Sequence, residues 1–286
     1  MKKILFCLLA FYTPVSIVIA QNTTNSPTSM FGLGELSTGE GGQYAGLGGT
    51  GIALRGNNFL NNANPASLTE LTEQRFQIDA GIMGACQIYS QRGASNRSVT
   101  GNLNNLSIGC RIMPRWYGAI FMAPVSSVGY AITLDEEVAG TNGGTISSLF
   151  QGEGGLSKMG ISTAYLFGER FSVGTNLSYV TGTIIQTETQ GTATEETSSY
   201  KHTFYADFGV QYKWAIDRER SFVAGAVYGY SQDFKQDNNL YVSSSSGGDD
   251  IEKSLKRYRQ CLPQFFGLGA SYNLSLIHIS EPTRLR

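Results

Sequence analysis

Hydrophobic and polar residues alternate along much of the chain from residue 76 onward. In the clearest run, every even-numbered residue from Phe204 to Trp214 is apolar or aromatic, and most of the residues between them are polar. A period of two is typical of a β-strand, because successive side chains point to opposite faces. Eight segments follow the pattern, the last two most weakly: 76–88, 106–112, 128–134, 159–165, 171–179, 204–214, 221–230 and 262–272.

The connections between these segments are alternately short and long. The short links are 113–116, 168–170 and 215–220, and the long polar links are 90–101, 135–155, 186–199 and 231–260. Outer-membrane barrels have this arrangement, with short periplasmic turns and long outer loops. We therefore predict an all-β fold, an antiparallel β-barrel in the cell outer membrane with membrane lipid around it.

Aromatic residues gather beside the short links, at Trp116, Tyr117, Phe167, Phe171, Tyr212 and Trp214. Rings at this level of a barrel form a girdle between the hydrocarbon core and the lipid headgroups. The alternative is a secreted β-sandwich whose aromatic residues pack an internal core. A sandwich does not need strictly alternating long and short links, so the pattern favours the barrel.

The two ends of the chain differ from its middle. A basic start and an apolar stretch closing on Ala20 predict a signal peptide over residues 1–20. A membrane anchor is the alternative, but the run is short for a spanning helix and contains Pro14. Residues 274–286 resemble translated sequencing adapter and are interpreted as a non-native tail. Residues 75–273 would then form a partial transmembrane barrel, truncated to about eight strands, which we expect to be an open, curved sheet because no strand closes it.

Composition narrows the classes of function. The formal net charge of -1 provides no basic face for nucleic acid. The cysteines have no spacing typical of a metal site, and the only histidines are His202 and His278. We predict that the protein is not an enzyme and has no catalytic residues, cofactor or metal site; a barrel lipase that depends on His202 is the alternative. The Gly46–Gly51 match to G-x-G-x-x-G lacks the strand and helix of a dinucleotide site.

A glycine-rich segment and then Asn64, Pro65 and Ala66 precede the first predicted strand. In layout, roughly residues 46–273 resemble the FadL family of outer-membrane transporters for hydrophobic compounds. The resemblance implies that residues 21–74 form a hatch that plugs the barrel, with Asn64, Pro65 and Ala66 as the hatch motif.

The predicted wall contains an irregular stretch at Pro124, Val125, Ser126 and Ser127. Proline cannot donate a hydrogen bond to a strand ladder, and the alternation changes phase at the two serines. In the FadL family the third strand is kinked and opens the wall sideways, so the resemblance implies a lateral opening at these four residues. The alternative is an ordinary bulge without a function.

Polar residues on the opposite face from the apolar set are expected to line the lumen, and we single out Asp79, Arg111, Asn176 and Asp207. A hairpin centred in the link 90–101 would place Asp79 and Arg111 nearly opposite each other, as a lumenal ion pair. A solvated pair without a function is the alternative.

The family resemblance implies a function as well as a fold. It implies transport of a hydrophobic small-molecule ligand, such as a long-chain fatty acid or an aromatic hydrocarbon, through a plugged barrel. The alternative is a binding or shuttle protein of a secretion system from the same family, with exported proteins as its partners. The residues leave the substrate, the native C-terminus and the oligomeric state open.

Overall fold

The computed structural model describes residues 24–37, 44, 46–56, 59–71, 76–91, 94–137, 144–217, 220–247, 250–256 and 258–274. The predicted signal peptide lies outside these ranges, and so does the predicted tail apart from Leu274. Among the described residues, no helix has both the length and the apolar character needed to cross a membrane.

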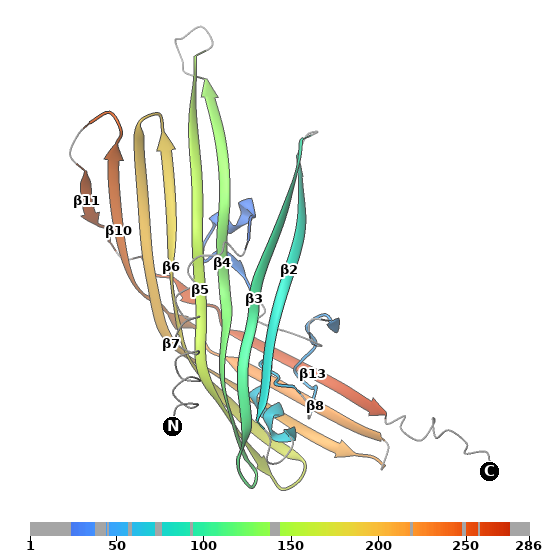
Figure 1. The fold of residues 1–286 in the computed structure, drawn as a ribbon. Coiled ribbons are helices and arrows are strands. Elements are labelled where there is room, and N and C mark those ends of the chain that lie inside the picture. Colours follow the sequence, from blue (N-terminus) through green and yellow to red (C-terminus); the bar gives the residue numbers. More distant parts are fainter. Residues whose placement is uncertain are drawn as a thin grey trace, which may run out of the picture.

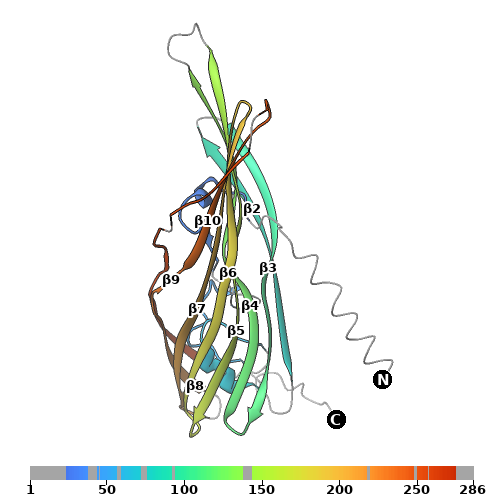
Figure 2. The same cartoon turned by 90° about the vertical axis from the view of Figure 1, so that its left-hand side faces the viewer.

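The described chain is an antiparallel sheet that curls into a half-barrel (Figures 1 and 2). This confirms the predicted all-β class and the predicted open, curved sheet. Each of the first six long strands pairs with the next one along the chain. They are β2 (Gln77–Gln91), β3 (Ala94–Met113), β4 (Trp116–Glu137), β5 (Thr145–Phe167), β6 (Phe171–Gln190) and β7 (Ala193–Ala215).

The last part of the sheet consists of two interrupted strands. The ascending pieces are β8 (Arg220–Gly229), β9 (Gln232–Asp233) and β10 (Lys235–Ser244), and the descending pieces are β11 (Ile251–Ser254), β12 (Cys261–Leu262) and β13 (Phe265–Leu274). β8 pairs with the lower half of β7 and β10 with its upper half, while β13, β12 and β11 pair with β8, β9 and β10. The eight predicted segments lie in strands apart from Phe76, Tyr230, Pro263 and Gln264, and the interruption explains why the last two segments have the weakest pattern.

The predicted long loops are wrong for most of their length. The links 135–155 and 186–199 are largely strand, because the β4–β5 ladder continues to Glu137 and Thr145 and the β6–β7 ladder to Gln190 and Ala193. The stretch 186–199 is rich in threonine and polar on both faces, and the few apolar residues of 135–155, among them Ile146, Leu149 and Phe150, do not alternate regularly. Both stretches therefore lack the one-sided apolar pattern used to predict strands. Threonine nevertheless favours extended backbone, and the ladder satisfies the backbone groups.

Two of the short links, 113–116 and 168–170, are confirmed as tight turns at the lower end of the sheet; the third, 215–220, is only partly within the described residues. Arg115 adopts a positive φ of 70° between β3 and β4, and Gly168 adopts a φ of 64° between β5 and β6. The left-handed conformation costs glycine little, whereas at Arg115 it is a local strain within the turn.

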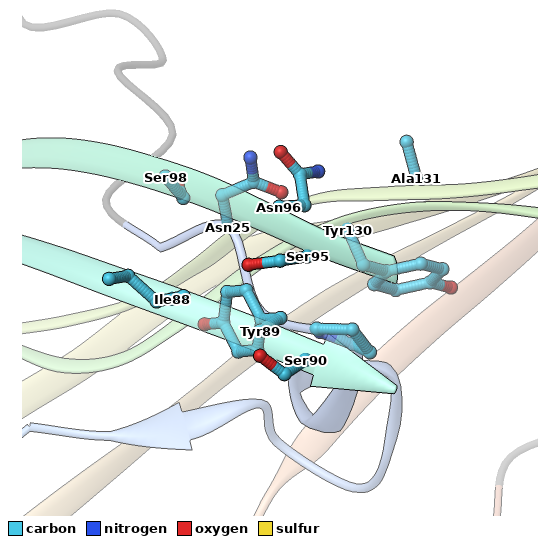
Figure 3. Close-up of a pocket in the computed structure, with 10 residues that line it drawn as sticks. Asn25, Ile88, Tyr89, Ser90, Ser95, Asn96, Ser98, Tyr130 and Ala131 are labelled. Carbon is cyan, nitrogen blue, oxygen red and sulfur yellow. The ribbon is translucent and has the colours of Figure 1, made fainter. Parts of the chain in front are cut away.

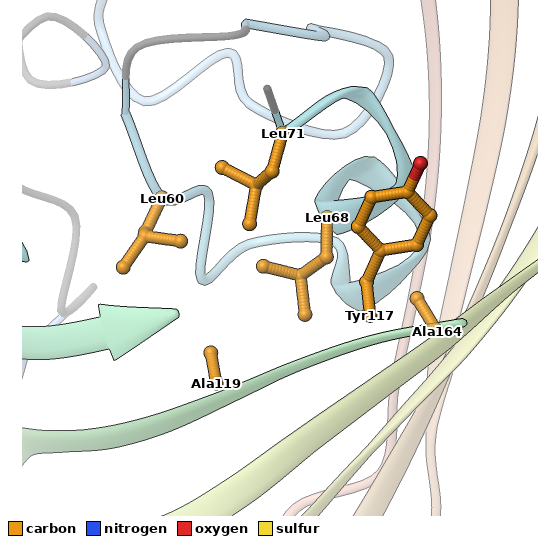
Figure 4. Packing of buried hydrophobic residues seen from close by; sticks show 6 residues of the cluster. All are labelled: Leu60, Leu68, Leu71, Tyr117, Ala119 and Ala164. Atoms are coloured by element: carbon orange, nitrogen blue, oxygen red, sulfur yellow. The ribbon is translucent and has the colours of Figure 1, made fainter. Parts of the chain in front are cut away.

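The N-terminal part of the chain lies against the concave face of the sheet. It includes the short 3-10 helices η2 (Pro27–Met30) and η3 (Pro65–Glu70) and the short strand β1 (Glu35–Leu36). Leucines on and near η3 pack on small and aromatic wall residues in one buried cluster (Figure 4): Leu60, Leu68, Leu71, Tyr117, Ala119 and Ala164. This cluster is a core that the sheet builds only together with the N-terminal segment.

Wall glycines provide the space for η3. A Cβ on Gly174 of β6 would lie 2.5 Å from the carbonyl carbon of Pro65 and 2.6 Å from the amide nitrogen of Ala66. A Cβ on Gly209 of β7 would overlap the side chain of Asn64. The backbone of η3 therefore approaches the sheet as closely as it does because these two wall positions have no side chain.

Replacing Gly174 with valine should displace η3 and destabilise the protein by about 1–3 kcal/mol, because the added atoms overlap plug backbone. Unfolding in denaturant measures the stability, and limited thermolysin digestion reports on η3. Gly101→Val is the control, since a Cβ there has no atom within 4 Å. Equal stability and equal cleavage of the two variants would contradict this packing.

Candidate functional site

The wall irregularity lies on β4. The β4–β5 register shifts between Pro124, which pairs with Ser157, and Ser126, which pairs with Leu156, so that Val125 is an extra residue. Below the shift the odd-numbered residues of β4 are buried on the concave side, and above it Ser126, Val128 and Tyr130 are buried instead. The structure thus places a bulge at the four residues singled out from the sequence.

β3 and β4 separate just below this bulge. Their register runs from Met113 and Trp116 up to Leu106 and Met122. Above that point β3 stays paired with β2, and within the described residues it has no further register partner on β4. Figure 1 shows the upper parts of β2 and β3 leaning away from β4. The upper half of β4 therefore presents a strand edge that its neighbour in sequence does not cover.

Residues 24–37, which we call the edge segment, occupy part of that edge. Glu35 and Leu36 of β1 pair antiparallel with Ser127 and Ser126. The Ser37 amide donates to the Val125 carbonyl at 2.9 Å, and the Ser26 amide donates to the Gly129 carbonyl at 2.8 Å. The edge segment thus acts as a short substitute strand beside the bulge.

The edge segment fits closely. Gly34 has a φ of +88°, and a Cβ there would lie 2.6 Å from Cγ2 of Val128. The Glu35 carboxylate accepts hydrogen bonds from the hydroxyls of Thr24 at 2.7 Å and Thr28 at 3.1 Å, which folds the segment back on itself. Only glycine combines this backbone conformation with this close approach.

Two cavities of about 550 and 500 Å³ lie next to the edge segment, between the upper parts of β3 and β4. Both are lined by Asn25, Ser98, Tyr130 and Ala131, and Figure 3 shows the larger one, which also reaches Tyr89 of β2. We call this region, bounded by β3 above Leu106 and β4 above Met122, the slot. It is the candidate functional site.

The predicted hatch motif has a local structural role. Asn64 caps η3, because its Oδ1 accepts a hydrogen bond from the Ala66 amide at 3.0 Å, and Pro65 occupies the first turn. The Asn64 amide group also donates to the carbonyls of Ile52 at 2.7 Å and Val210 at 3.3 Å. These three residues lie far from the slot, at the lower contact between plug and wall.

An ionic cluster holds the same region. Arg55, with only 3% of its side chain exposed, lies 3.5 Å from the Glu70 carboxylate and donates from Nε to the Gln211 Oε1 at 2.8 Å. The Lys213 Nζ lies 2.5 Å from Oε1, the other carboxylate oxygen of Glu70. Burial lowers the pKa of the Arg55 guanidinium, and the charge and hydrogen bond of Glu70 oppose that shift. The cluster joins plug to wall.

The structure does not form the predicted lumenal pair of Asp79 and Arg111, but it brings together the other two predicted lumenal residues. Asn176 donates to the Asp207 carboxylate at 2.7 Å. Asp79, however, pairs with Ser107. Arg111 lies four residues further along β3, with its guanidinium 5.9 Å from the ring centroid of Tyr117. The hairpin turns earlier than expected, because Gln91 already pairs with Ala94.

Other contacts were missed by the sequence analysis. Arg55 and Glu70 are isolated charged residues in a plug that is otherwise mostly uncharged. This isolation was the only feature of the sequence that could have indicated their ion pair. The pairing of β1 with β4 left no signal in the sequence, since two residues are too few to show a period.

His202 lies between the rings of Tyr179 and Tyr200, at centroid distances of 6.2 and 5.4 Å. No group of His, Cys, Asp or Glu suited to a metal ion is found among the described residues.

Comparison with models of protein families gives a match. A family model described as BamG matches residues 1–272. No curated protein and no solved structure matches the chain. The family associates the chain with the outer membrane, which agrees with the predicted location at that membrane.

The match overturns the FadL resemblance and what was drawn from it. Transport of hydrophobic compounds was a wrong prediction, as was the alternative of a FadL-family secretion shuttle, because the family that matches is BamG. The predicted hydrophobic small-molecule partner is wrong for the same reason. The resemblance rested on a layout, a plug before a barrel wall, and on the tripeptide Asn64 to Ala66, whose role as a helix cap is useful in any fold.

Replacing Glu70 with glutamine should destabilise the protein by about 1–2 kcal/mol, because it leaves the buried Arg55 without a counter-charge. The midpoint of unfolding in urea measures the effect. Asp217→Asn is the matched control: both side chains of its pair with Arg220 are half exposed to solvent, so its loss should destabilise the protein less than the loss of the Glu70 charge does. An equal cost for both variants would show that the plug cluster is no stronger than a surface pair.

Proposed function

Because the chain belongs to the BamG family, we propose that it takes part in the assembly of outer-membrane proteins as a component of a BAM complex. The family match over residues 1–272 is the observation that carries the proposal. The architecture supports it: a curled wall with a tightly held plug provides a scaffold, and the slot provides a place where the wall can be approached from the side.

We further propose that the wall is embedded in the membrane. An outward row of apolar residues crosses six strands in direct register, and the members from β2 to β6 are each between 42% and 67% exposed. The row is Ile78, Ile108, Ile120, Ile161, Leu177 and Ala206. A belt of exposed isoleucine and leucine of this width is unfavourable in water and suits lipid.

The height of the belt also suits a bilayer. On β7 the outward positions are apolar or aromatic from Trp214 up to Tyr200 and become polar from Ser198 to Thr194. About 14 steps of roughly 3.3 Å, on a strand tilted by about 45°, span about 33 Å along the membrane normal. The remaining upper parts of the strands would then stand in water above the membrane.

We propose a role without catalysis. His202 lies on the outward face of β7 beside two tyrosine rings, and this aromatic setting is consistent with a position near the membrane interface. Its ring therefore has an explanation that does not require lipid hydrolysis.

The belt can be tested on one strand. Phe208→Arg, at mid-height of the β7 belt, should destabilise the inserted protein by about 2–4 kcal/mol and raise the fraction removed by an alkaline membrane wash. Thr194→Arg is the control, because it lies on the same face above the belt. Equal extraction of both variants would show that the belt does not face lipid.

The assembly role predicts that depleting the protein lowers the amount of folded outer-membrane barrels, measured by their heat-modifiable mobility in gels. A tagged copy should purify with the BAM complex. Re-expression of the wild-type protein or of His202→Ala should restore barrel assembly equally. Normal assembly after depletion, together with no co-purification, would contradict the proposed function.

A further inference from the structure

We propose that the upper edge of β4 is a docking site for an extended β-strand of an unfolded outer-membrane protein, and that the edge segment holds this site until such a strand displaces it. The inference rests on the proposed function, because it names the substrate class and the place where it binds. It is drawn from the slot between β3 and β4.

The edge has the chemistry needed to bind a strand. From Ser126 to Glu137, β4 is paired with β5 on one side, while on the other side β3 has separated from it. Only Ser126 and Ser127 have strand register partners on that second side among the described residues. A strand edge in this state pairs through its backbone with extended chains of many sequences, as β-augmentation requires.

The present occupant shows that the site accepts a strand, and that this one pairs over a short length. Apart from that pairing it is held to β4 by two backbone hydrogen bonds and by the Ser29 hydroxyl, which lies 3.1 Å from both the amide nitrogen and the carbonyl oxygen of Gly129. The edge segment is bound as antiparallel β-structure, yet its register covers only two residues. β4 and β5, by contrast, pair from Trp116 to Glu137 with only Val125 left out. The hydroxyl of Ser126, which pairs with Leu36, is buried and has no hydrogen-bond partner in the described part of the chain, an unfavourable feature of this contact. A longer incoming strand would make more backbone hydrogen bonds than it replaces.

The space around the edge suits an incoming strand as well. The cavities of about 550 and 500 Å³ adjoin Tyr130 and Ala131, directly beside the edge. Their linings mix aromatic and aliphatic residues with serines and asparagines, including Tyr89, Ser98 and Asn96. A strand of a nascent barrel alternates apolar and polar side chains, and both kinds find matching surroundings here.

The length of the edge agrees with the proposed substrate. Val125 to Glu137 offers about as many residues as the 9–11 that a transmembrane strand contains. The segment from Ala131 to Glu137 lies beyond the edge segment and has no register partner on the β3 side in the described ranges. An incoming strand can therefore first pair above the edge segment and then extend downward by displacing it.

Photo-crosslinking in the purified BAM complex tests the site. A benzophenone amino acid is placed at Ala131 on the free edge of β4. The control position is Ile161 on β5, a strand that is paired on both sides, with β4 and with β6. The probe is a labelled peptide of about 11 alternating valine and threonine residues; the control peptide has the same length but a proline at every third position, which prevents pairing. We expect at least about fivefold more crosslinking of the alternating peptide at Ala131 than at Ile161, or than of the proline peptide.

A disulfide tests displacement. The Ser37 amide bond to Val125 makes the neighbouring pair, Leu36 and Ser126, the non-hydrogen-bonded kind, in which Cα atoms lie about 4.5 Å apart, within the range of a disulfide. L36C/S126C in a background without Cys86, Cys110 and Cys261 should lose about fivefold in crosslinking at position 131 when oxidised and regain it when reduced.

Gly34→Ala tests the same step in the opposite direction and does not need a disulfide. The added Cβ would overlap the Ser127 carbonyl, so the edge segment should loosen and peptide crosslinking at position 131 should rise by about fivefold. Gly46→Ala is the control, because a Cβ there has no atom within 4 Å.

The outcomes separate the inference from the proposed function. Crosslinking that is equal at positions 131 and 161, or that responds to neither the disulfide nor Gly34→Ala, would overturn the docking site while leaving the assembly role in place if the protein still purifies with the BAM complex. Failure to purify with that complex, combined with normal barrel assembly after depletion, would instead remove the proposed function on which the inference rests.

Discussion

The need to satisfy every backbone amide and carbonyl group governs this structure. An antiparallel ladder meets that need along most of the wall, from β2 to β7, and leaves the outward side chains free to be apolar. Where β3 separates from β4, the ladder stops and the chain's own N-terminal residues cover part of the open edge. The bulge at Val125 is at the same place, since an extra residue bends a strand and reverses the faces above it.

The plug and the wall depend on each other for the same physical reason. Glycines at 174 and 209 let the backbone of η3 come close, Asn64 caps that helix, and Arg55 and Lys213 both pair with the Glu70 carboxylate at the contact. The lower contact is held by an ionic cluster and a helix cap, whereas the upper contact has a two-residue strand pairing, a few backbone hydrogen bonds and the Ser29 hydroxyl on Gly129. This difference makes the upper end of the N-terminal region the part that a partner can replace.

The alternation of residues 204–214 predicted both the strand and its two faces, because a period of two follows directly from backbone geometry. The pattern could not show that β6 and β7 continue to Gln190 and from Ala193, where both faces are polar, nor that β8 and β10 are separate pieces. Long-range pairing was harder still. Glu35 and Leu36 form a strand only by pairing with Ser127 and Ser126, about 90 residues away in the sequence. The hatch motif misled the family assignment, since Asn64 and Pro65 serve a local cap.

The most direct test of this account is a competition between two disulfides in the intact protein. Leu36 and Ser126 face each other if the edge segment occupies the slot, whereas Asn102 and Ser126 would face each other if β3 continued in the register set by Leu106 and Met122. The account predicts rapid oxidation of the 36–126 cysteine pair and little of the 102–126 pair. Preferred formation of the 102–126 bond would show that the wall is closed and that the slot does not exist.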